Sequence, residues 1–482
     1  MADELKMFID DEWVPSQSGA VFDATSPATG EVIASIPEGT REDARRAIAA
    51  ANRAWEGWGA RSAFDRAAAM KRMAEEVDRR REDLARTLTL DQGKPLRAEA
   101  HDEVEELIAY FDMAAADATR MEGIMPPSVD ASKRVFVHRV PRGVVGAITP
   151  WNWPYTMPGE LLAPALAVGN AVVWVPAPTT SVCAIKLAEV IAAADLPAGV
   201  FNMVTGPGPV VGDEIAANPG THAVGFIGSI ATGHRVAERA AGKDLLLEMG
   251  GNGPLVILDD GDAEAAVTAS LEACFLNAGQ SCTAGERILV NDAVHDEYRE
   301  RLAAAVAEQV RLGDPFDDAT TMGPLNNEPT AGKTERHVND AVNRGAIVVA
   351  GGGRVPKFGT PLYFEPTVLD DVTEEMEVAR EETFGPVVPI TTIKDESEAV
   401  RVVNESPYGL LSAVFTRDIA RGLRFAESVR TGWVNVNEGT NYWESHLPFG
   451  GRAGSKSGVG RVGGRFSLER FTELKTVIVS MR

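Results

Sequence analysis

The stretch Val144-Val-Gly-Ala-Ile-Thr149 begins a regular alternation of short apolar runs and longer segments with helical spacing. Short apolar runs between turn residues predict buried strands, and apolar residues three or four positions apart predict helices. Strands and helices that alternate at this pitch form a sheet of parallel strands with crossover helices. We therefore predict a doubly wound α/β sheet, with strands at 144–149, 171–175, 200–204 and 223–227 and helices at 181–194, 210–217 and 230–241.

A second α/β series follows Gly250-Gly251, which we take as the boundary between two halves of the chain. Helical segments separate its strands, as in the first series. The second half contains Cys282. Its predicted strands are 255–258, 288–290, 347–349, 387–390, 413–416 and 432–436.

The region before residue 121 is predicted to be mostly helical. Short strands are expected at 5–36, where Pro and Gly interrupt the apolar runs, and Thr40 is placed to cap the first helix. The apolar spacing predicts a second helix from Ser62 to Leu88 and a third between 95 and 120.

Two other segments have the pattern of exposed strands. Residues 133–140 alternate between polar and apolar side chains within 121–141, which we predict to be a hairpin, and 474–480 form a terminal strand. Strands with unpaired edges favour pairing with another chain. We therefore expect a homodimer or a homotetramer.

Length and charge restrict the classes of partner. A chain of 482 residues is expected to form two large domains. Its 47 Lys and Arg against 70 Asp and Glu give a net charge of −23. Nucleic acids and anionic membranes require a basic protein surface, so neither is expected as a partner. No signal peptide and no apolar run of membrane-spanning length is recognised.

The three cysteines have no Cys-x-x-Cys spacing, so neither a disulfide framework nor a thiolate zinc site is expected. The seven histidines form no ligand motif, and no metal is expected. Reduced thiols suit a reducing compartment, and we expect a cytoplasmic protein.

Gly279-Gln-Ser-Cys282 places a thiol among small and polar residues after an apolar helical pattern. A free cysteine is more often a small buried hydrophobe than a nucleophile, and Cys183 and Cys274 lie in helical patterns that favour packing. The neighbours of Cys282 instead favour a nucleophile with room for a substrate. An unperturbed thiol has a pKa of about 8.5, so the site must help it to ionise.

Two upstream segments carry groups that such a nucleophile needs. Asn152 lies between Trp151 and Trp153 in a loop fixed by two prolines. It is either a turn residue or an oxyanion donor, with the backbone N–H of Cys282 as the second donor. Glu248 ends an apolar run shortly before two glycines. Burying a carboxylate there costs free energy unless water solvates it or the reaction uses it, so the position favours a general base.

Two glycine-containing segments could contact a dinucleotide. Gly206-Pro-Gly-Pro-Val-Val-Gly212 resembles a dinucleotide fingerprint but has one residue too many before its last glycine. Gly228-Ser229 and Gly233 begin a predicted helix and suit a pyrophosphate better, because amides at a helix N-terminus bind anions.

The segments around Asn152, Glu248 and Cys282, in this order and at these separations, resemble the aldehyde dehydrogenase superfamily over nearly the whole chain. The resemblance implies that Cys282 is the nucleophile, Asn152 the oxyanion donor and Glu248 the general base. It implies NAD or NADP as cofactor and a small aldehyde as substrate. The implied domains are a Rossmann-like cofactor domain (1–121 and 142–250), a catalytic domain (251–445), and a β oligomerisation flap with the C-terminal strand (122–141 and 446–482).

The resemblance also assigns Glu382 to the nicotinamide ribose and Phe384 to the nicotinamide. The implied cofactor contacts are Ile148, Pro150, Trp151, Val175, Gly208, Gly228, Ser229, Gly250, Glu382 and Phe384. The implied substrate pocket contains Trp153, Met157, Ser281, Thr283 and Trp443. Leu276 and Tyr442 are expected in the same tunnel, which would favour an apolar or aromatic aldehyde, and no arginine is placed there as a clamp for a semialdehyde carboxylate.

The chain departs from the family pattern at two places. Where the family has Lys-Pro-x-Glu, the chain reads Val175-Pro-Ala-Pro178, without the lysine that pairs with a 2′-phosphate or the glutamate that repels it. We expect NAD to be preferred over NADP with shallow discrimination. Residues 452–456 also form a longer loop between Gly451 and Ser457 than the family has, which is expected to reshape the edge of the site.

Two other functions compete with hydrolytic oxidation of the aldehyde through a thiohemiacetal and thioester on Cys282. Enzymes of this superfamily that transfer the acyl group to coenzyme A usually lack the carboxylate at the position of Glu248. A catalytically silent structural homologue, such as the crystallins of this superfamily, has no need to retain all three groups. The sequence therefore favours the hydrolytic reaction.

Overall fold

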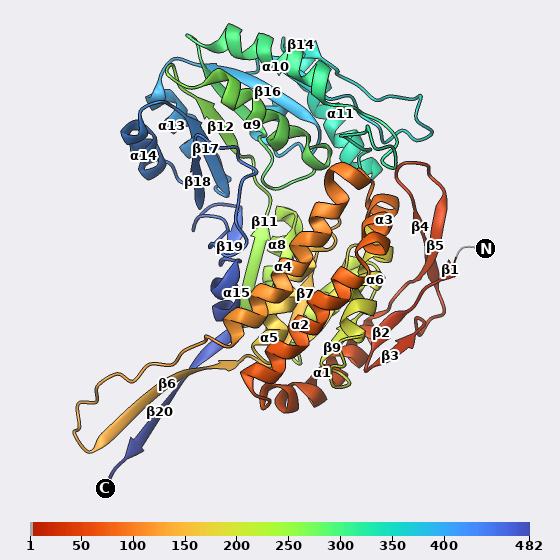
Figure 1. The fold of residues 1–482 in the computed structure, drawn as a ribbon, viewed down its shortest axis with the longest axis vertical. Helices are drawn as coiled ribbons and strands as arrows, with labels where there is room; N and C mark the ends of the chain where they lie inside the picture. Colours follow the sequence, from red (N-terminus) through yellow and green to blue (C-terminus); the bar gives the residue numbers. More distant parts are fainter. Residues whose placement is uncertain (1–2) are drawn as a thin grey trace.

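Four sheets organise residues 3–482, the part of the chain that the computed structural model describes (Figure 1). Two large sheets form separate lobes, a small sheet lies near the N-terminus, and a two-stranded arm projects from the lower lobe. No helix among the described residues combines the length and the apolar character needed to cross a bilayer.

The first large sheet has a core of five parallel strands, as the alternation of strands and helices predicts. All four strands predicted for the first series are present. Antiparallel strands extend it at both edges. Its strands, in spatial order, are β19 (Gly458–Val459), β11 (Asp244–Met249), β10 (Ala223–Gly228), β7 (Val144–Ile148), β8 (Ala171–Val175), β9 (Phe201–Met203), β2 (Met7–Ile9) and β3 (Glu12–Val14).

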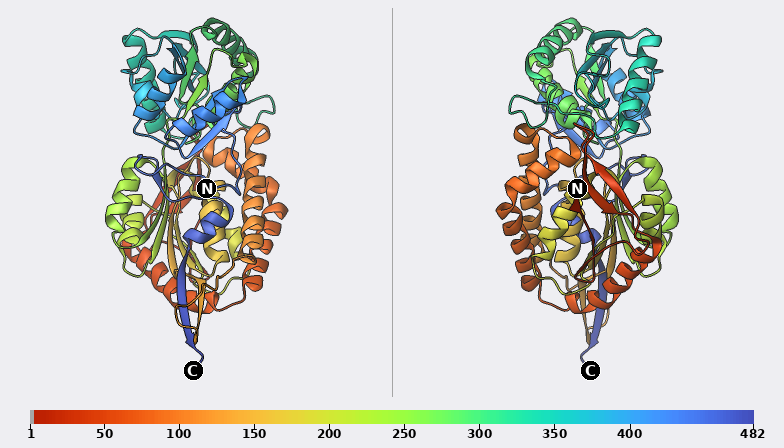
Figure 2. Two further views of the ribbon diagram at one scale, coloured as in Figure 1. Left: turned by 90° about the vertical axis from the view of Figure 1, so that its left-hand side faces the viewer. Right: turned by 90° about the vertical axis from the view of Figure 1, so that its right-hand side faces the viewer.

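Helices cover both faces of this sheet (Figure 2). Alternate residues of β8 divide between the faces, since Val172 and Trp174 pack in one cluster and Val173 and Val175 in another. The first face carries α2 (Ala63–Arg79), α3 (Arg81–Gln92), η1 (Leu96–Ala100), α4 (His101–Ala118), α5 (Thr156–Ala167) and α6 (Ser181–Ala192). The second carries α1 (Arg41–Gly59), η3 (Gly208–Gly212), α7 (Asp213–Ala217) and α8 (Ile230–Arg239), and the short η2 (Pro178–Thr180) precedes α6.

Local sequence explains where the N-terminal helices begin and end. Thr40 and Asp43 form the capping box that starts α1. The prediction of one helix from Ser62 to Leu88 is wrong, because the chain leaves helical geometry at Arg80 (φ −104°, ψ 12°) and α3 begins anew. Gly93, with φ +102°, ends α3 in the left-handed conformation that glycine adopts without strain.

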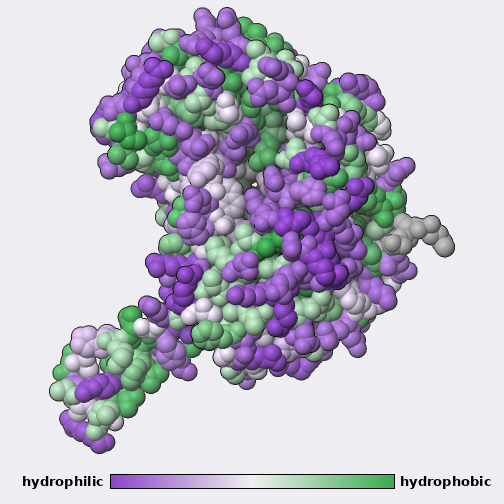
Figure 3. All heavy atoms as spheres, in the orientation of Figure 1, coloured by the Kyte–Doolittle hydropathy of each residue, from purple (hydrophilic) through white to green (hydrophobic). Residues whose placement is uncertain are grey.

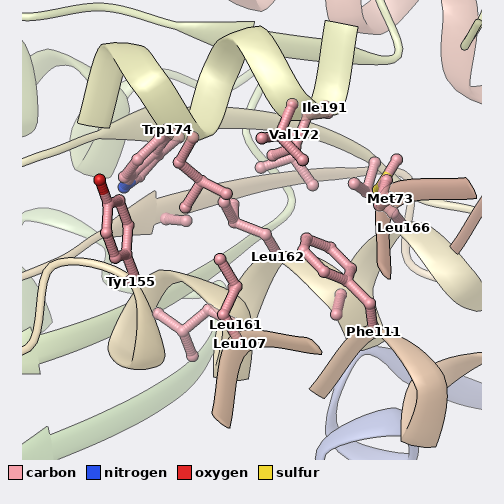
Figure 4. Packing of buried hydrophobic residues seen from close by; sticks show 14 of the residues in the cluster. Met73, Leu107, Phe111, Tyr155, Leu161, Leu162, Leu166, Val172, Trp174 and Ile191 are labelled. Atoms are coloured by element: carbon pink, nitrogen blue, oxygen red, sulfur yellow. The ribbon is translucent and has the colours of Figure 1, made fainter. Parts of the chain in front are cut away.

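The core beneath the first face is densely packed (Figure 4). Leu161, Leu162 and Leu166 of α5 lie against Trp174 and Phe111, and all five side chains are buried. The indole N–H of Trp174 donates to Thr149 Oγ1 across 2.9 Å. Helix α5 was not predicted from the sequence.

The second large sheet contains every strand predicted for it, and a further strand, β15, that the sequence did not indicate. The edge strand β14 runs antiparallel to β15, and the other pairs are parallel. In spatial order the strands are β14 (Ile347–Ala350), β15 (Thr367–Asp370), β16 (Val387–Ile393), β13 (Arg287–Asn291), β12 (Pro254–Ile257), β17 (Leu411–Phe415) and β18 (Trp433–Val436). Its helices are α9 (Ala263–Phe275), η4 (Leu276–Gly279), α10 (His295–Gln309), α11 (Glu328–Asn343), α12 (Glu377–Arg380), α13 (Glu396–Glu405) and α14 (Ile419–Ser428).

The projecting arm joins segments far apart in the sequence. The predicted hairpin at 121–141 is wrong in its main pairing, because β6 (Lys133–Pro141) pairs over its whole length with β20 (Thr472–Ser480). Only a single bridge, between Ile124 and Val137, links the strand to the segment before it. Apolar side chains gather on the arm (Figure 3), among them Leu474 and Ile478, each more than 60% exposed.

Not all of 446–482 belongs to the arm. Strand β19 pairs with β11, and α15 (Gly464–Arg470) packs on α4 and α5, so part of this segment completes the first lobe. The small N-terminal sheet contains β1 (Asp3–Glu4), β5 (Val32–Pro37) and β4 (Val21–Thr25).

Candidate active site

The first sheet has a topological switch point between β7 and β10. The chain proceeds from β7 through β8 to β9 on one side and then returns to place β10 and β11 on the other. Ligands of doubly wound sheets bind in the crevice at the carboxyl ends of such a strand pair. Pro150 and Trp151 follow β7, Gly228 ends β10 and Ser229 follows it, so four predicted cofactor contacts lie at this crevice.

A cavity of about 490 Å³ opens from this crevice toward the second lobe. All three predicted catalytic residues line it, together with all five residues predicted for the substrate pocket and seven of the ten predicted cofactor contacts. Those lining residues are Cys282, Glu248 and Asn152; Trp153, Met157, Ser281, Thr283 and Trp443; and Pro150, Trp151, Gly228, Ser229, Gly250, Glu382 and Phe384.

Cys282 follows a backbone segment of unusual conformation. After α9, Asn277 and Ala278 each have φ +53° and Gly279 has φ +74°, so three successive residues are left-handed. Such a conformation costs about 1–3 kcal/mol at each non-glycine residue and persists only where its surroundings fix it. Gly279 is required here because a Cβ would lie 2.2 Å from the carbonyl oxygen of Gly385.

Buried hydrogen bonds fix this segment. Both Glu99 oxygens accept from the backbone N–H of Asn277, at 3.0 Å each. The Asn277 side chain accepts from Gln92 Nε2 at 2.9 Å and donates to the carbonyl oxygen of Asn152 at 2.8 Å. Asn152 Nδ2 in turn donates to the carbonyl oxygen of Gln280 at 3.0 Å. The loop that carries Asn152 and the loop that carries Cys282 are therefore joined through Asn277.

The half-buried Cys282 thiol is held in its neutral form. Burial raises its pKa far above the ordinary range, and the carboxyl groups of Glu382, Glu248 and Glu160 act in the same direction. The backbone N–H of Cys282 opposes the shift. We expected the site to help the Cys282 thiol to ionise, but no cation among the described residues contributes to its pKa in that direction. The sequence correctly distinguished the other thiols, since Cys183 and Cys274 are buried in α6 and α9.

Glu248 lies at the end of β11 as a buried carboxyl group. Within residues 3–482 neither of its oxygens has a hydrogen-bond partner. Burial raises its pKa well above the usual range, Glu160 adds to the shift, and Arg461 opposes it. Gly450 makes room for it, since a Cβ there would lie 2.5 Å from Glu248 Oε1. A buried polar group without a partner beside a cavity is a binding site for water.

The two glycines after Glu248 let three segments approach one another. A Cβ at Gly250 would lie 2.6 Å from the Glu382 carboxylate, and one at Gly251 would lie 2.5 Å from the carbonyl oxygen of Cys282. The backbone N–H of Gly251 donates to Glu382 Oε1 at 2.9 Å. The glycines are therefore needed for close approach as well as for space beside the base.

Glu382 and Phe384 are placed by Glu286, which the sequence did not single out. The Glu286 carboxylate accepts from the backbone N–H groups of Thr383 and Phe384. Phe384, with φ +62°, presents its ring edge-on to Trp151 with centroids 5.6 Å apart. Burial raises the pKa of Glu382 to about 7, and the nearby Lys333 opposes that shift.

Three predicted cofactor contacts do not line the cavity. Ile148 and Val175 pair in register at the carboxyl ends of β7 and β8, and Gly208 begins η3. They remain predictions. Gly233 does not belong to an open cradle, because a Cβ there would lie 2.1 Å from the sulfur of Met249. Ser229 caps α8 by accepting from the backbone N–H of Thr232, so the N-terminus of α8 faces the crevice.

The cavity has further walls that the sequence did not reveal. Glu106 of α4, Glu160 of α5 and Glu272 of α9 line it, as do Lys333 and Phe449. Glu160 could have been noticed as the one charged residue within the apolar stretch 157–175. The predicted Leu276 and Tyr442 also line the cavity.

The longer loop at 452–456 does not line the cavity. Gly451 and Ser457 at its ends are buried, and four of the five residues between them are exposed. Ser457 Oγ donates to the carbonyl oxygen of Gly250 at 2.9 Å, which fixes the end of the loop beside β11. The additional length therefore extends into solvent and leaves the anchored ends in place.

Comparison with known proteins agrees with this geometry. The model of the aldehyde dehydrogenase family matches residues 13–477. The chain is 40% identical to 3-sulfolactaldehyde dehydrogenase of Pseudomonas putida, over 98% of this chain and 96% of that protein. It is 38% identical to the NADP(+) succinate-semialdehyde dehydrogenase of Escherichia coli K12, over 98% of this chain and 97% of that protein.

A solved structure of betaine aldehyde dehydrogenase from Staphylococcus aureus in complex with NAD+ is similar at a TM-score of 0.96. It is 35% identical to this chain and covers 99% of this chain and 95% of that one. The match in family and fold extends over nearly the whole sequence. The chain belongs to the aldehyde dehydrogenase family and is an oxidoreductase that oxidises an aldehyde to the carboxylate with NAD(P).

Proposed function

We propose that Cys282 is the nucleophile of this reaction, Asn152 the side-chain donor to the oxyanion and Glu248 the base that activates water. The observation that supports these roles most directly is that the three side chains line one cavity at the switch point of the first sheet. Among the three cysteines, Cys282 is the one with access to that cavity.

In the first half of the reaction, the thiol loses its proton and the sulfur adds to the aldehyde carbonyl. The carbonyl oxygen becomes an oxyanion that accepts from Asn152 Nδ2 and from the backbone N–H of Cys282. The structure supports this role of Asn152, because its side-chain amide donates to the Gln280 carbonyl oxygen and its backbone carbonyl oxygen accepts from Asn277 Nδ2, beside the Cys282 loop. Bound NAD(P) supplies the acceptor for the hydride that leaves the thiohemiacetal.

In the second half, water attacks the thioester on Cys282. Glu248 takes one proton from the attacking water, the carbon–sulfur bond breaks, and the carboxylate product leaves. The two unpartnered oxygens of Glu248 suit this role, since a water that enters the cavity would be their hydrogen-bond partner. The raised pKa of Glu248 makes the group a stronger base once it is ionised.

The residues present fit a dinucleotide. Gly250 lines the cavity and lets the Glu382 carboxylate approach closely, Ser229 lies at the N-terminus of a ten-residue helix, and the Trp151–Phe384 pair offers an aromatic wall. We assign Glu382 to the ribose and Phe384 to the nicotinamide. NAD is proposed as the preferred cofactor with shallow discrimination, because neither Val175 nor Pro178 carries a charge.

The rival reaction ends with transfer of the acyl group to coenzyme A. A single absorbance assay for aldehyde-dependent NADH formation, with and without coenzyme A, distinguishes the two. Turnover without coenzyme A and free carboxylate as product support hydrolysis. Turnover that requires coenzyme A would contradict it, and no turnover in either condition would point to a silent homologue.

We also propose that the chain forms a homodimer or homotetramer through the β6–β20 arm, whose apolar side chains are exposed and whose outer edges, apart from the Ile124–Val137 bridge, are unpaired within the described residues. The proposed domains are 1–121 with 142–250, 251–445, and 122–141 with 446–482, a division that the two separate large sheets support. The three free thiols agree with the proposed cytoplasmic location.

A further inference from the structure

Three carboxyl groups on the cavity wall have no role in the proposed mechanism. Glu106, Glu160 and Glu272 lie on three different helices and line the same cavity as Cys282. Lys333 is the sole lysine or arginine that lines it within residues 3–482. Acidic side chains therefore outnumber basic ones on the wall where a substrate would bind.

Glu160 is the buried member of these three carboxyl groups. The residue is only 5% exposed, and Oε1 accepts from the hydroxyl of Tyr110 at 3.3 Å. No hydrogen bond to Oε2 is formed by any residue of the described chain. Burial raises the pKa of Glu160 to about 8 and that of Glu106 to about 7, so a bound cation would favour the ionised carboxylates. Glu160 lines the same cavity as Cys282 and Glu248.

Glu106 strengthens the same region of the wall. It lies one helical turn before Tyr110 on α4, and its carboxylate accepts from Thr156 Oγ1 at 2.8 Å. Thr156 lies one turn before Glu160 on α5, and Tyr110, which donates to Glu160, lies one turn after Glu106 on α4, so the two carboxyl groups lie together where α4 packs on α5.

Two lysines near the cavity lie beside acidic groups of their own. Lys333 acts on Glu286 and Glu382, at the end of the cavity assigned to the cofactor. Lys94 Nζ lies 3.1 Å from the ring centre of Trp153, but it forms a 2.5 Å ion pair with Glu103 in which neither side chain is exposed. Lys94 is therefore not free to hold the anionic group of a substrate, and Lys333 lies near Glu382 rather than near the carboxyl groups of α4 and α5.

Aromatic rings complete the wall beside the carboxyl groups. Trp443 stacks on Tyr110 with centroids 6.3 Å apart and an interplanar angle of 27°, and it lines the cavity together with Tyr442. The faces of aromatic rings attract cations, and carboxylates form strong charge-assisted hydrogen bonds with ammonium groups. The aromatic rings and the carboxylates of this wall would therefore both bind an ammonium group favourably.

We propose that the substrate is an aldehyde that bears an ammonium group, which Glu160 and Glu106 bind beside Trp443 while Cys282 attacks the carbonyl. The inference rests on the proposed role of Cys282. It differs from the apolar or aromatic aldehyde expected from the tryptophans alone, because the sequence did not place Glu106 and Glu160 in the pocket.

Three aldehydes that share the chain R–CH2–CH2–CHO test this assignment. They are 3-aminopropanal (R an ammonium), butanal (R a methyl group) and succinate semialdehyde (R a carboxylate). Steady-state NADH formation gives kcat/KM for each with the full-length enzyme, and the ratio for 3-aminopropanal to butanal is the readout. We expect 3-aminopropanal to be preferred over butanal by at least about tenfold and succinate semialdehyde to be the poorest.

Glu160→Gln and Glu106→Gln should each lower that ratio, by about tenfold to 100-fold for Glu160, because a charge-assisted contact becomes a neutral one. Glu105→Gln is the matched control, since Glu105 precedes Glu106 on α4 but is exposed and pairs with Arg81 at the surface. The Glu105→Gln variant should keep the wild-type ratio of kcat/KM for 3-aminopropanal to butanal.

Two results would overturn the inference. The first is a wild-type preference for butanal or succinate semialdehyde, which does not depend on any variant folding. The second is an unchanged ratio in both Glu160→Gln and Glu106→Gln. Turnover of butanal without an ammonium preference would refute this inference and leave the proposed function intact, whereas absence of NADH with all three aldehydes would contradict both.

Discussion

Asn152 Nδ2 donates a hydrogen bond to the backbone carbonyl oxygen of Gln280 across 3.0 Å, two residues before Cys282 in the chain. The amide proposed to bind the oxyanion is thus fixed to the loop that carries the nucleophile before any substrate enters. Preorganised donors of this kind stabilise developing charge without reorganisation during the reaction.

Asn152→Ala should lower kcat by about 100- to 1000-fold, the range found when one oxyanion donor is removed, with a smaller effect on KM. Steady-state NADH formation measures it, and thermal unfolding checks that the variant is folded. A kcat within about threefold of the wild type would show that Asn152 is a turn residue only.

Gly450→Ala should displace the proposed base. A Cβ at this position would lie 2.5 Å from Glu248 Oε1, so the carboxyl group has to move. We expect kcat to fall by at least about tenfold because deacylation depends on the geometry of the base.

Gly454→Ala is the matched control for backbone strain. Gly454 also has positive φ (+87°), but no atom lies within 4 Å of where its Cβ would be, and the residue is exposed in the loop. Its activity should remain close to that of the wild type. An equal loss of kcat in the two variants would mean that backbone strain causes the effect, and it would contradict the proposed contact with Glu248.

Val175→Lys should raise kcat/KM for NADP relative to NAD, because an ammonium group at this position can pair with the 2′-phosphate. Val175→Met controls for side-chain length without charge and should leave the ratio unchanged. Initial rates with each cofactor give the ratio. A strong native preference for NADP would mean that other residues determine the choice and would refute the account given for Val175 and Pro178.

Ile478→Asp should weaken assembly. Ile478 is 61% exposed on β20, and a charge there is costly if another chain covers the arm. Light scattering at micromolar concentration should show a lower mass than for the wild type. Ile419→Asp is the control, since Ile419 is 62% exposed on α14. A monomeric wild type would contradict the proposed oligomer.

The parallel strands of both lobes could be predicted because each is a short apolar run between turn residues. Strand β15 escaped prediction because it has four residues between Pro366 and Asp371, and Asp371 turns away with φ +54°. The pairing of β6 with β20 could not be read locally, since the two strands are separated by more than 300 residues. Register between such distant segments depends on tertiary packing.

The catalytic residues were recognisable because each has an unusual neighbourhood in the sequence. The residues that hold the catalytic loops in place were not recognisable. Gln92, Glu99 and Asn277 act through hydrogen bonds between the two lobes, which no local sequence pattern encodes. The acidic wall was missed for a related reason. Glu106 lies on an amphipathic helix rich in acidic residues, where only the packing of α4 against α5 decides which of them faces the cavity.

The most direct measurement uses Glu248→Gln, which keeps the shape of the side chain but removes the base. When the variant is mixed with aldehyde and NAD, we expect a rapid burst of one NADH per active site, followed by nearly no turnover. Mass spectrometry of the stalled protein should then find the acyl group on the peptide that contains Cys282 and on neither Cys183 nor Cys274. No burst with slow linear turnover would mean that Glu248 also deprotonates the thiol, and full steady-state turnover would contradict the assignment of Glu248 as the base.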